Sequence, residues 1–107
     1  MKNNKLEIAP DTSFTQKSNY DWVNIINGKD RVGKARTKIS LEKLIINSIQ
    51  IYPQYRGKGF GKEYVYKCKN EYSVIIADKV RNSARKFWHK MGFKEMVNGN
   101  YKWKKIN

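Results

Sequence analysis

Residues 44–51 constrain the fold of this chain more than any other segment. Apolar side chains occupy both alternation phases of the segment, with Leu44 and Ile46 in one phase and Ile45 in the other. This pattern is typical of a strand that is covered on both faces at the centre of a sheet. The strand is expected to end just before Pro53, because proline cannot donate to a strand ladder. A sheet is therefore expected at the heart of the fold.

A helix and a second buried strand are predicted next. Residues 61–71 place Tyr64, Val65 and Cys68 on one side of a helix and most of their lysines on the other. Residues 74–77 are a short β-branched run, which favours another buried strand. The order strand, helix, strand produces a parallel strand pair with a crossover helix.

Antiparallel elements are predicted before this unit. Residues 22–26 and 31–37 indicate two strands that form a hairpin, because the Asn27-Gly28 pair between them readily adopts positive φ angles. One further short strand is expected at residues 6–9, and residues 1–20 have no room for a long amphipathic helix.

A second helix and two last strands are predicted after the strand–helix–strand unit. Residues 82–91 have apolar side chains at helical spacing, with Asn82 as the expected N-cap and Gly92 as the left-handed residue that ends the helix. The last two strands are expected at residues 93–97 and 101–106, on either side of an Asn98-Gly99 turn.

The fold class follows from these segments. They predict an α/β (α+β) fold, in which one mixed, mostly antiparallel twisted sheet carries a central parallel strand pair and two principal helices. The 107 residues suit a single domain over residues 1–107, of which residues 1–20 are the least well defined.

The net charge of the chain is strongly positive and unevenly distributed. Twenty-three Lys and Arg against nine Asp and Glu give a formal charge of +14. Residues 54–107 hold fourteen basic and four acidic residues, a balance of +10, against nine and five in residues 1–53, a balance of +4. A field of this size attracts anions. A nucleic acid, an acidic protein or a polyphosphate cofactor would each fit.

Cysteine content and the lengths of apolar runs indicate the cellular compartment of the protein. Cys68 is the only cysteine, so no intramolecular disulfide can form, and a reducing compartment is expected. Cys68 and the single histidine, His89, cannot supply four zinc ligands, so no metal site is predicted. The chain has no apolar run of eighteen residues and no signal-peptide pattern, so we expect a cytoplasmic, soluble protein without a membrane partner.

A glycine-rich segment, Arg-Gly-Lys-Gly-Phe-Gly-Lys at residues 56–62, joins the buried strand to the first helix. Its glycines let the backbone turn tightly, and the helix start adds a partial positive charge, so the segment predicts an anion site. A dinucleotide-binding fingerprint would need glycine where Lys62 stands, and a Walker A loop would need four residues between its glycines. Neither motif is present.

Two motifs resemble the signatures of the GNAT superfamily of acyl-CoA N-acyltransferases. Residues 52–62 resemble its Arg/Gln-x-x-Gly-x-Gly/Ala pyrophosphate loop, which follows the central strand. Residues 82–93 resemble its second signature, Asn-x-x-Ala-x-x-aromatic-Tyr-x-x-x-Gly-Phe in loose form. The resemblance covers residues 21–106. GNAT domains usually carry two helices between their first two strands, which residues 1–20 cannot both build, so the chain resembles a short variant of the family.

The resemblance implies acetyl-CoA as cosubstrate and a set of residues that bind it. Backbone amides of the glycine-rich segment would bind the pyrophosphate, the end of the central strand would pair with the pantetheine arm, and the second helix would lie near the far side of the cofactor. The implied cofactor-binding residues are Ile49, Gln50, Ile51, Arg56, Gly57, Lys58, Gly59, Phe60, Gly61, Lys62, Asn82, Arg85 and Trp88.

The family's chemistry is direct attack of an acceptor amine on the thioester in a ternary complex, with a backbone amide polarising the carbonyl oxygen. Trp88 stands where the family usually has the tyrosine proposed to protonate the departing thiolate, and indole cannot supply that proton. Glu42, at the start of the central strand, is the candidate general base. Cys68 is expected to be a core residue and not a nucleophile. An acceptor site without the two helices would admit a macromolecule, such as a protein lysine or N-terminus.

Two functions therefore remain open from the sequence. The first is an acetyl-CoA-dependent N-acetyltransferase that modifies an amine, expected to be on a macromolecule. The second is a non-catalytic GNAT-fold binding module whose basic C-terminal half binds nucleic acid or an acidic protein partner.

Overall fold

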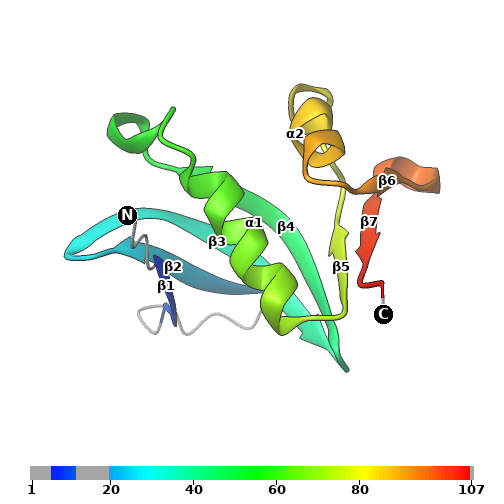
Figure 1. The fold of residues 1–107 in the computed structure, drawn as a ribbon, viewed down its shortest axis with the longest axis horizontal. Helices are drawn as coiled ribbons and strands as arrows, with labels where there is room; N and C mark the ends of the chain where they lie inside the picture. The colour runs from blue at the N-terminus through cyan, green and yellow to red at the C-terminus, as the bar shows by residue number, and fades with distance from the viewer. Residues whose placement is uncertain (1–5, 12–19, 107) are drawn as a thin grey trace.

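The structure is a computed structural model that describes residues 6–11 and 20–106. Predictions for residues 1–5 and 12–19 lie outside the described residues. Within the described part, one seven-stranded sheet has the order β1-β2-β3-β4-β5-β7-β6 (Figure 1). The strands are β1 (Leu6–Pro10), β2 (Asp21–Asn27), β3 (Asp30–Ser40), β4 (Lys43–Ile51), β5 (Val74–Ala77), β6 (Lys94–Glu95) and β7 (Tyr101–Lys104). The helices are α1 (Phe60–Glu71) and α2 (Arg85–Lys90), with 3-10 turns η1 (Pro53–Tyr55), η2 (Asn82–Ala84) and η3 (Val97–Gly99).

The sheet has one parallel pair, and this confirms the predicted fold class. β4 and β5 run parallel, with Leu44 opposite Ile75 and Ile46 opposite Ala77, and α1 is the crossover between them. The other neighbouring strands pair antiparallel. A mixed sheet with a central parallel pair and two principal helices is the architecture expected from the strand–helix–strand pattern.

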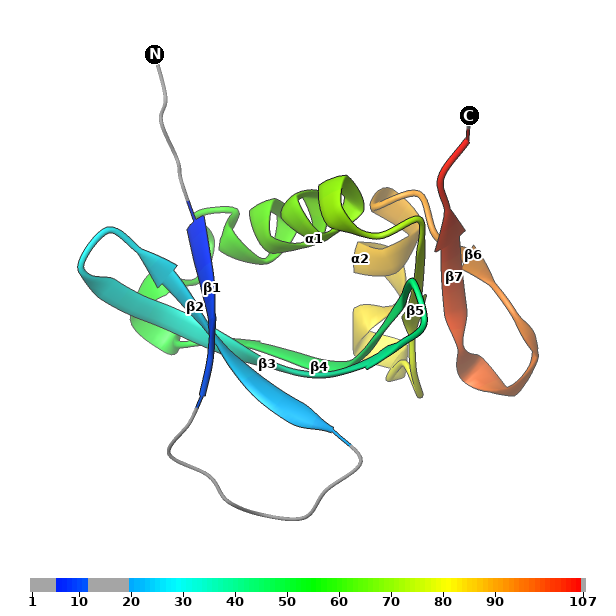
Figure 2. The same cartoon turned by 90° about the horizontal axis from the view of Figure 1, so that it is seen from below.

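One face of the sheet is covered by both helices. α1 lies across the central strands and α2 lies beside it toward β5 and β7 (Figure 2). The side chains that α1 buries fall at helical spacing and include Tyr64, Val65 and Cys68, as predicted. They join the inward residues of the strands in one core, whose largest fully buried side chains are Tyr64, Tyr101, Ile25, Ile46, Ile75, Val32 and Val65.

The opposite face carries no helix among the described residues, and the β4 side chain Ile45 on it is less buried than Leu44 and Ile46 on the helix-covered face. Strand register places Ile45 of β4 on this face, in a row with Lys38, Ile76 and Lys102. Ile45 is only half-buried. We call this the helix-free face.

The C-terminal elements are shorter than predicted. α2 begins at Arg85 after the 3-10 turn η2, and Asn82 starts that turn without a side-chain cap, so its predicted N-cap role was wrong. Gly92 does end the helix in the left-handed region, with φ +86°, and Phe93 N–H donates to Trp88 O at 3.0 Å. The last two strands shrink to β6 and β7 because η3 occupies the turn, where Asn98 and Gly99 both have positive φ as predicted.

The helices of the described part are too short or too polar to cross a membrane.

Candidate functional site

The glycine-rich segment forms a loop with unpaired amides at the start of α1. Gly57 and Gly59 have φ of +80° and +85°, and Gly59 is the N-cap residue of the helix. The first amide bound into the helix is that of Glu63, which donates to Gly59 O at 2.9 Å. The amides of residues 57–62 donate to no group in the described part of the chain, whereas that of Arg56 donates to Pro53 O at 3.2 Å. Six consecutive N–H groups are thus available to an anion.

The open space and the positive charge around the loop also suit an anion. A Cβ atom built on Gly57 or Gly59 would meet nothing within 4 Å, so the loop faces open space on the side of its glycines. Lys58 and Lys62 are exposed, and the helix dipole adds positive potential at this end of α1. Arg56 ties the loop to the end of β4, because its Nε donates to Ile51 O at 2.9 Å.

β4 diverges from β5 beside this loop. Their pairing ends at Ile46 and Ala77, and Asp78 N–H donates to Ile46 O at 2.8 Å as the last link. The register with β3 passes from Thr37–Ile46 to Arg36–Ser48, so Asn47 is the extra residue of a β-bulge. Beyond it, the outer edge of β4 pairs with no strand of the described chain.

The orientation of this edge follows from alternation along the strand. Tyr52 N–H donates to Val32 O of β3 at 2.9 Å. Since N–H groups alternate in direction along a strand, those of Ile49 and Ile51 point away from β3, toward the unpaired edge. An extended molecule could therefore pair with Ile49 and Ile51, as the sequence predicted for the pantetheine arm.

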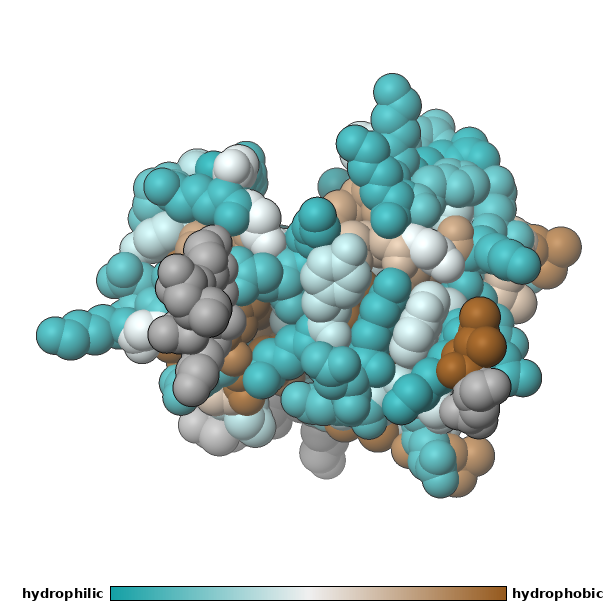
Figure 3. Space-filling view, viewed as in Figure 1, coloured by the Kyte–Doolittle hydropathy of each residue, from teal (hydrophilic) through white to brown (hydrophobic). Residues whose placement is uncertain are grey.

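α2 lies across from β4, on the other side of the gap that opens where β4 and β5 diverge. Two contacts hold it against α1: the Phe87 ring lies 3.8 Å from the Cβ position of Gly61, and Lys69 Nζ donates to Met91 O. Partial burial lowers the pKa of Lys69, which also lies 5.1 Å from the centre of the Trp103 ring. Figure 3 shows a notch on this side of the molecule, between the lobe that carries the glycine-rich loop and the lobe that carries α2.

Arg85 and Trp88 have other partners in the structure than the cofactor predicted for them. Arg85 Nη2 donates to both carboxylate oxygens of Glu95 at 2.9 and 3.0 Å, and its Nε donates to the Tyr101 hydroxyl at 3.0 Å. Trp88 is 6% exposed and its ring centre lies 4.8 Å from that of Phe93. Both side chains therefore serve packing of α2 against the sheet. Asn82 remains exposed at the start of η2.

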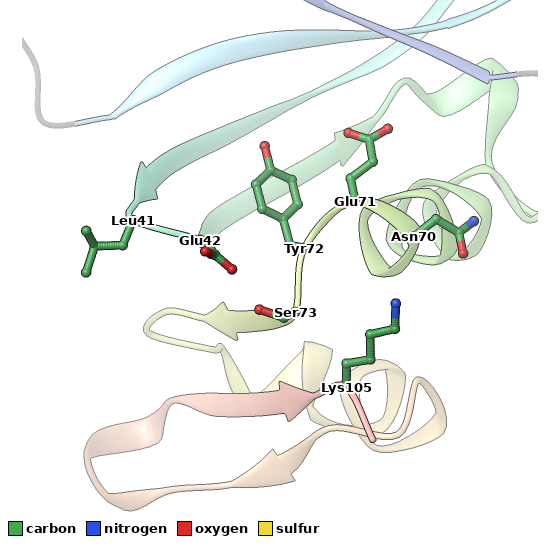
Figure 4. A pocket seen from close by; sticks show the side chains of 7 residues that line it. All are labelled: Leu41, Glu42, Asn70, Glu71, Tyr72, Ser73 and Lys105. Atoms are coloured by element: carbon green, nitrogen blue, oxygen red, sulfur yellow. The ribbon is translucent and has the colours of Figure 1, made fainter. Parts of the chain in front are cut away.

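Glu42 lies far from the glycine-rich loop. The nine residues of β4, at about 3.3 Å each, separate Glu42 from Ile51 by roughly 30 Å. Glu42 lines a pocket of about 470 Å³ at the end of α1, together with Glu71, Tyr72 and Lys105 (Figure 4). The loop joins the end of β4 to the start of α1, whereas this pocket lies between the start of β4 and the end of α1. The structure therefore does not bring the predicted base to the predicted cofactor site.

One polar pair at the divergence of β4 and β5 escaped the sequence analysis. The Tyr20 hydroxyl donates to Asp78 Oδ2 at 2.7 Å. The two residues are 58 positions apart, and neither belongs to a recognised motif, so no local signal could have joined them. The hydrogen bond raises the pKa of Tyr20 above its ordinary value, with burial as the second cause.

The fold is similar to that of solved acetyltransferase structures. A candidate N-acetyltransferase from E. coli bound to coenzyme A matches with a TM-score of 0.72 and 14% identity, over 94% of this chain and 99% of that chain. A Bacillus subtilis acetyltransferase in complex with CoA matches with a TM-score of 0.68 and 13% identity, over 95% and 100%. A GNAT family acetyltransferase from Elizabethkingia anophelis with acetyl-CoA bound matches with a TM-score of 0.63 and 16% identity, over 97% and 100%.

These similarities establish the fold of the chain as that of the GNAT acetyltransferases. No protein-family model and no curated protein matches the sequence. The solved chains are matched over their whole length or nearly so, and therefore the fold occurs in proteins of this size.

Proposed function

We propose that this chain, which has the GNAT acetyltransferase fold, is an acetyl-CoA-dependent N-acetyltransferase. The observation that carries the proposal is the run of unpaired amides at residues 57–62, placed at a helix start directly after the diverging edge of β4. Five structural neighbours with this fold were solved with CoA or acetyl-CoA. Acetyl-CoA supplies the acetyl thioester that an amine can attack.

The residues available for acetyl-CoA fall into two groups. The amides of Gly57 to Lys62 would hold the diphosphate, with Lys58 and Lys62 adding charge. The outward N–H groups of Ile49 and Ile51 would pair with the pantetheine arm, in the manner of an added strand. Arg56 contributes by fixing the loop to β4 through its bond to Ile51 O.

The transfer would be a direct attack without a covalent enzyme intermediate. The amide of Ile49 is the outward N–H closest to the bulge, and it would donate to the thioester carbonyl oxygen as negative charge develops there. Cys68 cannot act as the nucleophile, because it is buried in mid-helix and burial raises the pKa of its thiol to about 12. An amine acceptor would reach the thioester from the helix-free face. The openness of that face among the described residues supports an amine on a macromolecule, such as a protein lysine or N-terminus.

Calorimetric titration with acetyl-CoA tests the cofactor site. Gly59→Glu places a carboxylate against the proposed diphosphate position, while Gly28→Glu is its matched control. Both glycines have positive φ, at +85° and +65°, and open space around the Cβ position, but Gly28 lies in the β2–β3 turn. Both variants should therefore pay a similar conformational cost, and only Gly59→Glu should lose affinity, by tenfold or more. Equal affinity in wild type and Gly59→Glu would remove the site.

A binding module is the second candidate, and the helix-free face favours it. Strand register and exposure put a row of cations there, and two of them pack on aromatic rings: Lys34 Nζ lies 4.5 Å from the Trp22 ring centre and Arg36 lies 5.1 Å from that of Tyr20. Basic side chains interleaved with aromatic rings are typical of surfaces that bind single-stranded nucleic acid. The basic residues of this face are Lys34, Arg36, Lys38, Lys43, Lys94, Lys102 and Lys104.

Retention of a labelled single-stranded oligonucleotide at increasing salt tests this candidate. The double variant Lys38→Gln/Lys102→Gln removes two cations from the helix-free face, and Lys29→Gln/Lys90→Gln removes two from elsewhere. The slope of log K against log salt becomes less steep by about 0.7 for each lost phosphate contact. Lys38→Gln/Lys102→Gln should therefore reduce its steepness by about 1.4, and Lys29→Gln/Lys90→Gln should leave it unchanged. Equal slopes in both variants would exclude the face as a nucleic-acid surface.

A further inference from the structure

The gap between β4 and β5 has a defined inner end. β5 pairs with β4 only as far as Ile46, and the Asp78 N–H bond to Ile46 O is its last link. From Ile51 back to Ile46 is five residues, or roughly 16 Å of strand. A chain that starts at the glycine-rich loop and pairs with this edge must stop at Ile46, because Ala77 at the end of β5 already pairs with β4 there. Its far end would therefore lie beside Asp78.

Tyr20 reaches the same point from the helix-free face. Tyr20 stands two positions before Trp22, which lies opposite Arg36 of β3, and Arg36 lies over the Tyr20 ring. The Tyr20 hydroxyl bonds to Asp78 Oδ2 at 2.7 Å. The Tyr20 side chain thus joins Arg36 of β3 to Asp78 and places a tyrosine–carboxylate pair at the inner end of the gap, on the side from which an acceptor would enter.

We propose that Asp78 is the general base of the acetyl transfer and that Tyr20 is the positioning residue that holds its carboxylate. This inference rests on the proposed function. The amine nitrogen forms a bond to the thioester carbonyl carbon, and its proton passes to Asp78 as that bond forms. The C–S bond then breaks, the electron pair leaves with sulfur, and the proton moves from Asp78 to the thiolate. Asp78 returns to its carboxylate form, and the products are an N-acetyl amide and CoA thiol.

Glu42 and Trp88, the other side chains considered for proton transfer, cannot take this role. Glu42 is five residues before the bulge at Asn47, about 16 Å along the strand. Trp88 is buried against Phe93 and has no transferable proton. Because Tyr20 has its pKa raised, its hydroxyl stays protonated and keeps donating to one carboxylate oxygen, while the other oxygen can receive the acceptor's proton.

Variants at the pair, measured by CoA thiol release, test the proposal. The acceptors are a peptide with one lysine between glutamates, benzylamine, and water alone. Asp78→Asn should lower kcat about 100-fold, since general base catalysis contributes about 10²–10⁴, and Tyr20→Phe should lower it about tenfold. The calorimetric Kd for acetyl-CoA should stay within twofold in both. Asp30→Asn, at the exposed start of β3, is the matched control and should keep the wild-type kcat.

The outcomes separate this proposal from the proposed function. Wild type that binds no acetyl-CoA overturns the proposed function itself, and this proposal falls with it. Wild type that binds acetyl-CoA but releases no thiol with any of the three acceptors keeps the cofactor site but overturns the proposed transfer, and this proposal falls with it. Unchanged kcat in Asp78→Asn overturns only the role of the pair, as does a loss of kcat that is accompanied by comparable losses in acetyl-CoA affinity and melting temperature. A selective fall in kcat supports it.

Discussion

Gly33 should be one of the least replaceable residues of the sheet, because β3 and β4 meet there without room for a side chain. A Cβ atom on Gly33 would lie 2.4 Å from Gln50 O, 2.9 Å from Ile51 Cδ1 and 3.0 Å from Ile51 Cα. Two of these atoms belong to the backbone, so a rotamer change cannot relieve the contact. The methyl group of Gly33→Ala would have to move the end of β4, which also supplies the carbonyl that Arg56 binds.

The expected cost follows from that geometry. Overpacking of a core costs about 1–3 kcal/mol, and a clash with a backbone carbonyl belongs at the upper end. We therefore expect Gly33→Ala to lower the free energy of unfolding by about 3 kcal/mol. At roughly 4 °C per kcal/mol for a domain of this size, the melting temperature should fall by about 12 °C.

Urea and thermal denaturation followed by circular dichroism would measure this effect, with Gly61→Ala as the opposite case. A Cβ atom on Gly61 would lie 3.8 Å from the Phe87 ring, an ordinary contact. Gly61 is also helical, so alanine there should stabilise the protein by about 0.5–1 kcal/mol. A Gly33→Ala protein within about 0.5 kcal/mol of wild type, the range of an ordinary surface change, would refute the close approach of the two strands.

Three further predictions concern side chains around α2 and in α1. Trp88→Tyr introduces the tyrosine that is usual in the family, and the loss of buried volume should lower the free energy of unfolding by about 1–3 kcal/mol. The rate of thiol release should not rise; a faster rate would show that a side chain at position 88 can supply the proton. Arg85→Gln should leave acetyl-CoA affinity within twofold, because the guanidinium is held by Glu95, and calorimetry would reveal a larger loss if it contacted the cofactor. Burial raises the pKa of Cys68 to about 12, so the folded state holds the thiol proton more tightly than the unfolded state. The free energy of unfolding should therefore fall as pH rises from about 9 toward 12, and Cys68→Ala should reduce that slope in urea titrations.

The local features of the chain were readable because each depends on neighbours in the sequence. The helical spacing of Tyr64, Val65 and Cys68 predicted the buried side of α1, which begins one residue earlier than expected. Asn-Gly pairs predicted both turns, since glycine accepts positive φ without strain. The motif at residues 82–93 predicted the left-handed glycine that ends α2, but not the 3-10 turn that replaces its first residues.

The glycine-rich segment was predictable as a loop at a helix start, but its surroundings were not. The bulge at Asn47 and the divergence of β4 from β5 depend on how three strands pair, and pairing is a non-local choice. Glu42 was assigned a role from its place at the start of the central strand, and the length of β4 puts it far from the loop. Arg85 lies in the motif at residues 82–93 that resembles the family signature. Its pairing with Glu95 depends on how the chain folds back after α2, which the motif does not predict.

By itself the sequence determined which segments form strands and helices and where the anion-binding turn lies, because propensity, periodicity and turn chemistry act over a few residues. Only the tertiary structure decided that both helices cover the same face of the sheet, and that Tyr20 meets Asp78 at the inner end of the gap. Those contacts join residues far apart in the chain, and strand order and sheet twist, which bring them together, leave no trace in any short run of residues.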